Sequence, residues 1–296
     1  MKVLYWLESI RAPWLDAVML AISQLGGEIL FMAIVIALFW CMDKRKGYYL
    51  MTVGFFGIVA NQFLKLVFRV SRPWIRDPEF TIVEGARAGA TGYSFPSGHT
   101  QNAAAVLGCP ARMARKKGLK ITLWVLYALV GISRMYLGVH TPYDVGVGVV
   151  MGLVLVFGLY PFFSEKNYKP QRMYVLLGVM LALSIAFTTY TRLYPFPADI
   201  EVDNLSHGIK NGYTLTGAVA GMLAAFWLDE HYVHFQTAGS LPAHIVKCVV
   251  GLGLLLGIKT VLKPPMNALF GGDPIADAFR YAIVVFFAAG LWPMTF

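Results

Sequence analysis

Long apolar runs alternate with short charged loops along almost the whole chain. A helix that crosses a bilayer needs about 20 mostly apolar residues, and several runs reach that length. We therefore expect an all-α fold, a polytopic bundle of transmembrane helices. The expected spans are 29–42, 48–68, 100–116, 120–139, 143–163, 172–190, 211–228, 243–262 and 275–292.

Two stretches depart from this simple pattern. Residues 1–25 mix apolar and polar positions before Gly26 and Gly27, which predicts amphipathic helices lying at the membrane interface. Residues 100–116 are only modestly hydrophobic and contain Pro110. Such a composition is typical of a helix that packs among other helices rather than against lipid.

Basic residues cluster in the loops at 44–46, 112–120 and 166–172. Counting spans places these three loops on one side of the membrane, which is expected to be cytoplasmic because short cytoplasmic loops are enriched in lysine and arginine. The long loop 73–98 and the loop 191–210 then lie on the extracytoplasmic side. The second of these carries three acidic residues, Asp199, Glu201 and Asp203.

Composition supports a membrane protein and narrows its partners. Hydrophobic residues make up 57% of the chain and charged residues 14%, below the roughly 25% charged residues of soluble domains. The net charge of +9 is not accompanied by an RNA- or DNA-binding motif, so we expect membrane lipids and no nucleic acid as partners. The three cysteines form no CxxC pair and are interpreted as buried apolar side chains.

Three short polar clusters lie where apolar runs begin or end. The first runs from Lys65 to Arg72 and Pro73, the second is 93–100, and the third is 133–144. The expected topology brings all three to the extracytoplasmic face, although they are far apart in the chain. A single polar residue at a helix end more often extends to the interface, but three complementary clusters on one face favour a functional site.

The clusters contain three cations, Lys65, Arg72 and Arg134, near one membrane edge, where ionisable groups are costly and usually functional. An anion with two or more charges relieves their mutual repulsion. Phosphate fits, because guanidinium groups bind its oxygens through paired hydrogen bonds. Ser97 and Gly98 precede a predicted helix, whose free N–H groups favour an anion.

Two histidines add reactive chemistry. His140 and Asp144 are four residues apart, with Pro142 at the first turn of a predicted helix, so their side chains are expected to meet. A carboxylate on one ring nitrogen sets the tautomer and leaves the other nitrogen free to attack. His99 lies beside the phosphate-binding residues, where it can protonate a leaving oxygen and then activate water.

These clusters resemble the signature of the type 2 phosphatidic acid phosphatase superfamily, which includes bacterial lipid phosphatases, glucose-6-phosphatases and vanadium haloperoxidases. Every fixed position of its pattern, K-x6-RP, PSGH and SR-x5-H-x3-D, is present, and the resemblance covers residues 29–163. It implies that His140 is the nucleophile, with Asp144 as its partner and His99 as the general acid. It also implies that no metal or other cofactor is used and that phosphate is held by Lys65, Arg72, Ser97, Gly98 and Arg134.

The resemblance also divides the chain. Small bacterial members resemble a six-helix unit, so residues 26–190 are expected to form a phosphatase core. Residues 191–296 are then expected to add about three transmembrane helices. Arg69, on the same helix face as Lys65, is expected either to contact a second phosphate or simply to extend to the interface.

The expected function is that of an integral membrane phosphatase with its active site at the extracytoplasmic face of a bacterial plasma membrane. The expected substrate is a lipid phosphate or diphosphate, namely polyprenyl diphosphate, phosphatidylglycerol phosphate or phosphatidic acid. Two alternatives stay open: hydrolysis of a soluble sugar phosphate, as in glucose-6-phosphatases, and transfer of phosphate to an acceptor other than water. The sequence leaves the oligomeric state open.

Overall fold

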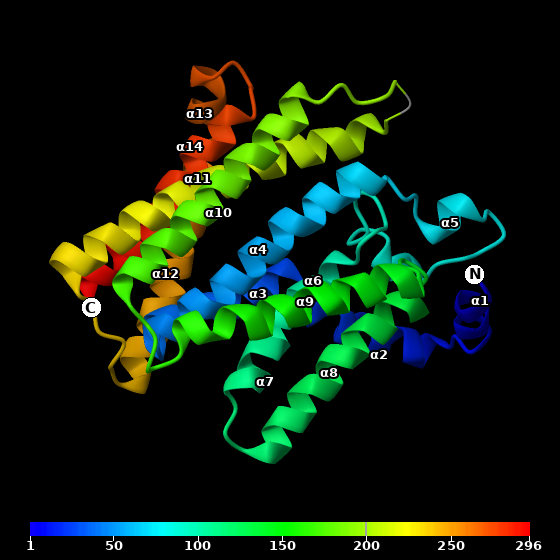
Figure 1. Cartoon of the computed structure of the whole chain (residues 1–296), viewed down its shortest axis with the longest axis horizontal. Coiled ribbons are helices and arrows are strands. Elements are labelled where there is room, and N and C mark those ends of the chain that lie inside the picture. Colours follow the sequence, from blue (N-terminus) through cyan, green and yellow to red (C-terminus); the bar gives the residue numbers. More distant parts are fainter. Residues whose placement is uncertain (199) are drawn as a thin grey trace. The chain divides into compact units, whose positions relative to one another are not determined.

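The computed structural model describes residues 1–198 and 200–296, and these residues form helices and loops without a strand (Figure 1). Asp199 lies outside the described residues. The expected all-α fold is confirmed. Six helical segments of the described chain are long and apolar enough to cross a membrane: Lys44–Arg76, Lys117–Tyr136, Pro142–Phe163, Pro170–Leu193, Leu241–Leu269 and Ile275–Thr295.

A seventh candidate span is the pair of helices α2 (Pro13–Gln24) and α3 (Glu28–Cys41), which are bent by 44° at the break between them. The stretch expected to span at 211–228 is helical, and the one expected at 100–116 is helical as far as Met113. Neither is among the six candidate spans. The helical pieces of the first are too short, and polar and small residues lower the hydropathy of the second.

The chain divides into two compact units. The first comprises residues 1–35 and 49–161, and the second comprises residues 36–48 and 162–296. The remaining helices of the first unit are α1 (Lys2–Ser9), α4 (Lys44–Phe68, which begins in the second unit), α5 (Pro73–Arg76), α6 (Gly98–Ala103), α7 (Cys109–Met113), α8 (Lys117–Tyr136) and α9 (Pro142–Phe163). The expected division of the chain at residue 190 stays a prediction.

The weakly apolar stretch of the first unit is helical in three consecutive pieces. Helices α6 and α7 are joined by a π-helical turn, Ala104–Gly108, and both pack against α8. Pro110 lies in the first turn of α7, and proline lacks the N–H that would continue a regular helical ladder. The residues of the π-helical turn are buried, as expected for a helix surrounded by protein.

The N-terminal helices are tied to the first unit by polar contacts. Helices α1 and α2 pack against α8. Arg11 Nε donates to the carbonyl oxygen of Tyr136 at 3.0 Å, and the Tyr136 hydroxyl donates to Asp16 Oδ1 at 2.7 Å. Glu8 accepts a hydrogen bond of 2.9 Å from the backbone N–H of Thr81. Residues 1–25 are therefore held both by a helix and by the long loop 73–98.

The second unit contains α10 (Pro170–Leu193), α11 (Val202–Leu228), α12 (Leu241–Val261), α13 (Lys263–Leu269) and α14 (Ile275–Phe286). Helix α11 packs against α10 and α14. Asp229, in the π-helical turn that follows α11, is buried. Its Oδ2 accepts from Lys44 Nζ at 2.6 Å and its Oδ1 from the backbone N–H of Phe235 at 2.9 Å, so this carboxylate has a structural explanation within the unit.

Candidate active site

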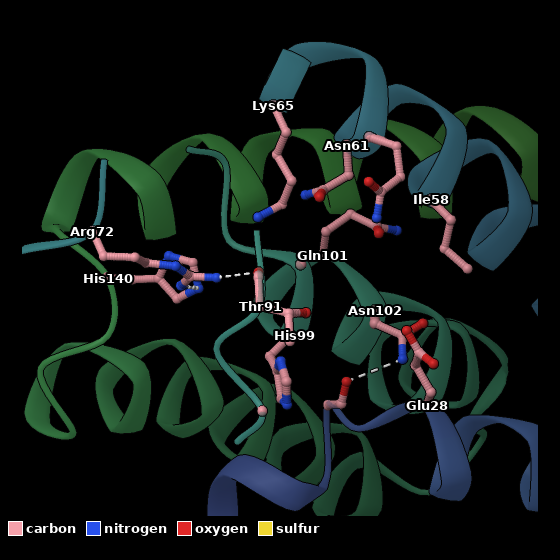
Figure 2. A pocket seen from close by; sticks show the side chains of 14 residues that line it. Glu28, Ile58, Asn61, Lys65, Arg72, Thr91, His99, Gln101, Asn102 and His140 are labelled. Atoms are coloured by element: carbon pink, nitrogen blue, oxygen red, sulfur yellow. Dashed lines mark hydrogen bonds between the residues drawn. The ribbon is translucent and has the colours of Figure 1, made fainter. Parts of the chain in front are cut away.

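A cavity of about 120 Å³ lies in the first unit, beside α4 and α6 and the loop that follows α5 (Figure 2). The three polar clusters of the sequence, far apart in the chain, meet around it. Five of the eight residues selected from the sequence line this cavity: Lys65, Arg72, Gly98, His99 and His140. The other three are buried in the surrounding wall: Ser97, Arg134 and Asp144.

Helix α4 supplies one wall through residues on a single face. Ile58, Asn61 and Lys65 are three and four residues apart, a spacing that places side chains on the same side of a helix. The helix ends at Phe68, and the next residue, Arg69, has a φ of 47°, so the chain turns before Arg72. Arg69 is not among the residues that line the cavity, whereas Arg72 reaches back into it.

The Arg72 guanidinium is fixed by four hydrogen bonds. It donates to the carbonyl oxygens of Thr91 (2.7 Å), Gly92 (3.0 Å) and Val139 (2.9 Å), and from Nη1 to Nε2 of His140 at 3.0 Å. A guanidinium only donates, so Nε2 must be the acceptor. The proton of the neutral His140 ring therefore lies on Nδ1.

The Nδ1 atom of His140 faces two oxygens. Asp144 Oδ2 is 3.6 Å away and Ser94 Oγ is 3.5 Å away. The Asp144 oxygen accepts shorter hydrogen bonds from Ser94 Oγ (2.6 Å) and from the backbone N–H of Thr141 (2.7 Å). The expected pairing of His140 and Asp144 is thus present as an approach of the carboxylate to the imidazole ring at 3.6 Å. The Ser94 hydroxyl lies within reach of both groups.

Cations surround both histidines. Burial, together with Arg134, Arg72 and Lys65, lowers the pKa of His99 to about 3. Burial and the same three cations hold the pKa of His140 well below its usual value. Both rings are therefore neutral at pH 7, and the charge of the cavity comes from the arginines and the lysine.

Arg134 and Lys65 differ in how they are held. Arg134 Nη1 donates to Ser23 Oγ at 2.7 Å, while its Nε and Nη2 have no hydrogen-bond partner among the described residues. Lys65 Nζ donates to the carbonyl oxygen of Tyr93. Buried donors without a partner are uncommon in native proteins, and on a cation they favour binding of an anion.

Ser97 caps the start of α6. Its Oγ accepts from the backbone N–H of Thr100 at 3.4 Å and lies 2.9 Å from Thr100 Oγ1. The helix begins at Gly98, two residues before the expected start at 100, and Gly98 is the residue of the pair that lines the cavity.

Several wall residues were not selected from the sequence. Ser94 holds Asp144, and Ser23 holds Arg134. Gly26 lies against the backbone of His99, where an added Cβ would be 2.3 Å from the His99 carbonyl oxygen. Only Ser94 had a local signal, because it lies inside the polar cluster 93–100, two residues before the PSGH motif. Ser23 and Gly26 come from the N-terminal helices, and only the packing of those helices brings them to the site.

Sequence comparisons agree with this constellation. Residues 45–168 match the PAP2 superfamily, and residues 213–296 match the PAP2 superfamily phosphatase, transmembrane extension. The chain is 34% identical over 172 residues to phosphatidylglycerophosphatase B of Bacillus subtilis, which covers 53% of this chain and 79% of that protein. The chain belongs to the PAP2 superfamily. The family resemblance is thereby confirmed, and the C-terminal helices correspond to a known extension of it.

Other PAP2 relatives come from bacteria and from a eukaryote. Undecaprenyl-diphosphatase BcrC of Bacillus subtilis is 28% identical over 152 residues, or 50% of this chain and 75% of that protein. A dihydrosphingosine 1-phosphate phosphatase of Schizosaccharomyces pombe is 27% identical over 303 residues, or 94% of this chain and 69% of that protein. No solved structure matches the chain. The family and its relatives indicate an integral membrane phosphatase, and these relatives are lipid phosphatases.

Proposed function

We propose that this PAP2 protein hydrolyses a lipid phosphate or diphosphate through a phosphohistidine on His140. The observation that carries the proposal is the arrangement of His140, whose Nε2 lone pair points to Arg72 inside a cavity that Lys65 and His99 also line. A phosphate that binds Lys65 and Arg72 in this cavity lies next to Nε2 of His140. The neutral state of the ring, favoured by burial and the surrounding cations, is the nucleophilic one.

In the first step, His140 Nε2 attacks phosphorus, a P–N bond forms and the P–O bond to the lipid breaks. The bound phosphate offsets the cations that lower the pKa of His99, so His99 takes up a proton and transfers it to the leaving oxygen. In the second step, His99 accepts a proton from water as that water attacks phosphorus. The P–N bond breaks and its electron pair returns to His140.

The remaining selected residues have supporting roles in this mechanism. Asp144 stabilises the positive charge that develops on His140 and keeps the proton on Nδ1. Lys65, Arg72 and Arg134, with Ser97 and Gly98 at the start of α6, bind the phosphate oxygens. Because these cations supply the charge stabilisation that Mg²⁺ supplies in many phosphoryl transfers, the reaction is proposed to need no metal.

A lipid substrate suits a site at the end of a membrane helix. Lys65 lies in the last turn of α4, so a phosphate there is near the membrane edge. The lipid chains then remain in the bilayer, and no apolar surface has to be moved into water at about 0.8 kcal/mol per CH₂. The candidates are polyprenyl diphosphate, phosphatidylglycerol phosphate and phosphatidic acid.

The test uses the purified full chain in detergent micelles with excess EDTA. We expect phosphate release from the lipids with a higher kcat/KM than from glucose 6-phosphate, and inhibition by vanadate. His140→Ala is expected to abolish turnover and covalent capture of labelled phosphate. The exposed His231 provides a matched control, His231→Ala. Near-normal turnover of His140→Ala would refute the phosphohistidine, and an equal rate with glucose 6-phosphate would refute the lipid assignment.

The site is proposed to face the extracytoplasmic side of a plasma membrane. A cysteine at the exposed Gly89, which lines the cavity, is expected to react with an impermeant thiol reagent added to intact cells. A cysteine at the exposed Lys117, in the first turn of α8, is expected to stay unlabelled until the cells are opened. The opposite labelling pattern would invert the orientation.

A further inference from the structure

The cavity has a second part that the phosphate chemistry does not use. On α4, the lining residues change in order from Lys65 to the amides Gln62 and Asn61 and then to Ile58. At 1.5 Å per residue, Asn61 lies about 6 Å and Ile58 about 10 Å further along the helix from Lys65. The wall therefore passes from a cation to a neutral amide and then to an aliphatic side chain.

Helix α6 adds two more amides to this part. Gln101 and Asn102 both line the cavity and are almost fully buried, with 1% and 5% of their surfaces exposed. Asn102 Nδ2 donates to the carbonyl oxygen of Gly26 at 3.0 Å. Its Oδ1 and the Nε2 of Gln101 have no partner among the residues that the structure describes. Buried polar atoms are normally paired, so an unpaired acceptor and donor at a cavity wall indicate a ligand that pairs with them.

The position of the Gln101 amide is built into α4. A Cβ added at Gly57 would lie 1.5 Å from Gln101 Nε2, so the absence of a side chain at this position makes the space that the amide occupies. Figure 2 shows Asn102 and Glu28 at the end of the cavity away from Arg72 and His140. Of the described residues that line the cavity, the lysine and arginine are Lys65 and Arg72, and neither lies beside Glu28 in Figure 2.

We propose that the amide wall binds hydrogen-bonding groups of the lipid backbone next to the phosphate. The preferred substrate is then a lipid monophosphate carried on a backbone with hydroxyl, amine or ester groups, rather than a prenyl phosphate or diphosphate. This inference rests on the proposed phosphatase function. The order along α4, cation then amide then aliphatic, matches the order phosphate, polar backbone and hydrocarbon chain in such a lipid.

The alternative lipids fit the wall less well. A prenyl chain has no donor or acceptor beyond its phosphates, so Gln101 and Asn102 would stay unpaired when it binds, and a site built to pair such groups rejects a ligand that lacks them. A second phosphate would meet neutral amides and the carboxylate of Glu28 instead of a cation. Arg69, the remaining candidate for a second phosphate, does not line the cavity.

The experiment compares kcat/KM of the purified full chain for four substrates of matched chain length. They are a sphingoid-base 1-phosphate, lysophosphatidic acid, an unbranched alkyl monophosphate and a prenyl diphosphate. Both backbone lipids are expected to exceed the alkyl monophosphate by at least about tenfold, because they satisfy the amides. Gln101→Met is expected to decrease this preference about tenfold, since methionine keeps the volume and removes the donor.

Melting temperature separates a binding role from a structural one. Gln101→Met removes a buried donor that has no partner, so its melting temperature is expected to equal or exceed that of the wild type. A structural role would lower the melting temperature and would lower kcat/KM for the backbone lipids and the alkyl monophosphate by the same factor. That result would overturn the inference. The matched control is Gln171→Met, at an exposed position in the first turn of α10, which is expected to keep the wild-type preference.

The two levels of the proposal fail in different ways. If the wild type hydrolyses the alkyl monophosphate or the prenyl diphosphate as efficiently as the backbone lipids, the amide wall is not a specificity site and the phosphatase function stands. If no lipid releases phosphate, the proposed function itself is wrong.

Discussion

The Nη1 atom of Arg72 lies 3.0 Å from Nε2 of His140 and donates a hydrogen bond to it. The lone pair that is proposed to attack phosphorus is therefore held by the same guanidinium that is proposed to bind phosphate. In the proposed mechanism, phosphate oxygens take over the Arg72 hydrogen bond and free the lone pair of His140 beside the phosphorus atom. Substrate binding and exposure of the nucleophile would then be one event.

Replacing Arg72 by glutamine is expected to lower kcat/KM strongly. The change removes a charged donor from the transition state, and loss of one such preorganised donor costs about 10²–10³-fold in kcat. It also removes the hydrogen bond that fixes the His140 ring. Steady-state kinetics with a lipid phosphate measure the effect. Arg76→Gln, at an exposed residue in α5, is the matched control and should retain activity; similar losses in both variants would argue against a specific role for Arg72.

Ser94 is expected to act as a positioning residue for Asp144. Its hydroxyl donates to Asp144 at 2.6 Å and lies 3.5 Å from His140 Nδ1. Ser94→Ala leaves the carboxylate with one hydrogen bond fewer and free to turn away from the ring. We expect kcat to fall at least about tenfold with little change in KM, since a hydrogen bond to a charged group contributes about 1.5–3 kcal/mol and tenfold in rate corresponds to about 1.4 kcal/mol.

Ser184 provides the control for this prediction. It is also buried, and its hydroxyl donates to the carbonyl oxygen of Leu181 at 2.9 Å within α10. Ser184→Ala should leave kcat at the wild-type level. A purely structural role for Ser94 would appear as lower melting temperature with unchanged kcat per folded molecule.

Stability is expected to decrease as the pH falls. Burial, and to a smaller extent the nearby arginines and Lys65, lowers the pKa of His99 to about 3 in the folded protein. A histidine in an unfolded chain titrates near 6.5. Between these two pH values the unfolded chain binds more protons than the folded protein. The contribution of neutral His99 to the free energy of unfolding is therefore complete above about pH 6.5 and decreases as the pH falls towards 3.

Melting temperatures between about pH 5 and about pH 8 test this dependence. His99→Asn should flatten the decrease on the acidic side, because the titrating group is gone. Vanadate should flatten it as well, because a bound anion offsets the cations and raises the pKa of His99. An acid slope that is identical in the wild type, the variant and the vanadate complex would exclude His99 as its source.

The sequence predicted most elements of the fold, and five of the residues selected from it line the cavity. Apolar length and basic loops are local properties, and Lys65, Arg72, His99 and His140 lie at helix ends that the topology brings together. The stretch 100–116 was predicted as a helix, but the π-helical turn in it was not. That turn depends on how the carbonyl groups before Pro110 are satisfied in the folded chain.

Long-range contacts were not predictable from local patterns. Ser23 looks like one more polar residue in an amphipathic stretch, and its bond to Arg134 exists only because α2 packs against α8. The unpaired amides of Gln101 and Asn102 likewise depend on where the cavity lies. The motif residues could be recognised from the local sequence, whereas the places of Ser23, Gln101 and Asn102 beside them depend on the packing of the helices.

Gly26 shows how closely the N-terminal segment approaches His99, the proposed general acid. The space for its Cβ is already taken by the backbone of His99, with the carbonyl oxygen at 2.3 Å and the carbonyl carbon at 3.0 Å. Backbone atoms cannot move aside as the end of a flexible side chain can. A methyl group at this position must displace either the start of α3 or the segment that carries His99.

Gly26→Ala is therefore expected to impair both folding and catalysis. Overpacking of this kind costs about 1–3 kcal/mol of stability, and a shift of about 1 Å in a catalytic group costs about 10²-fold in rate. Gly158→Ala is the control, because nothing lies within 4 Å of its added Cβ and it lies inside α9; there alanine should be neutral or stabilising by up to about 1 kcal/mol. Melting temperature and kcat are measured for both. Wild-type kcat in Gly26→Ala would show that His99 tolerates displacement and would weaken its assignment as the general acid.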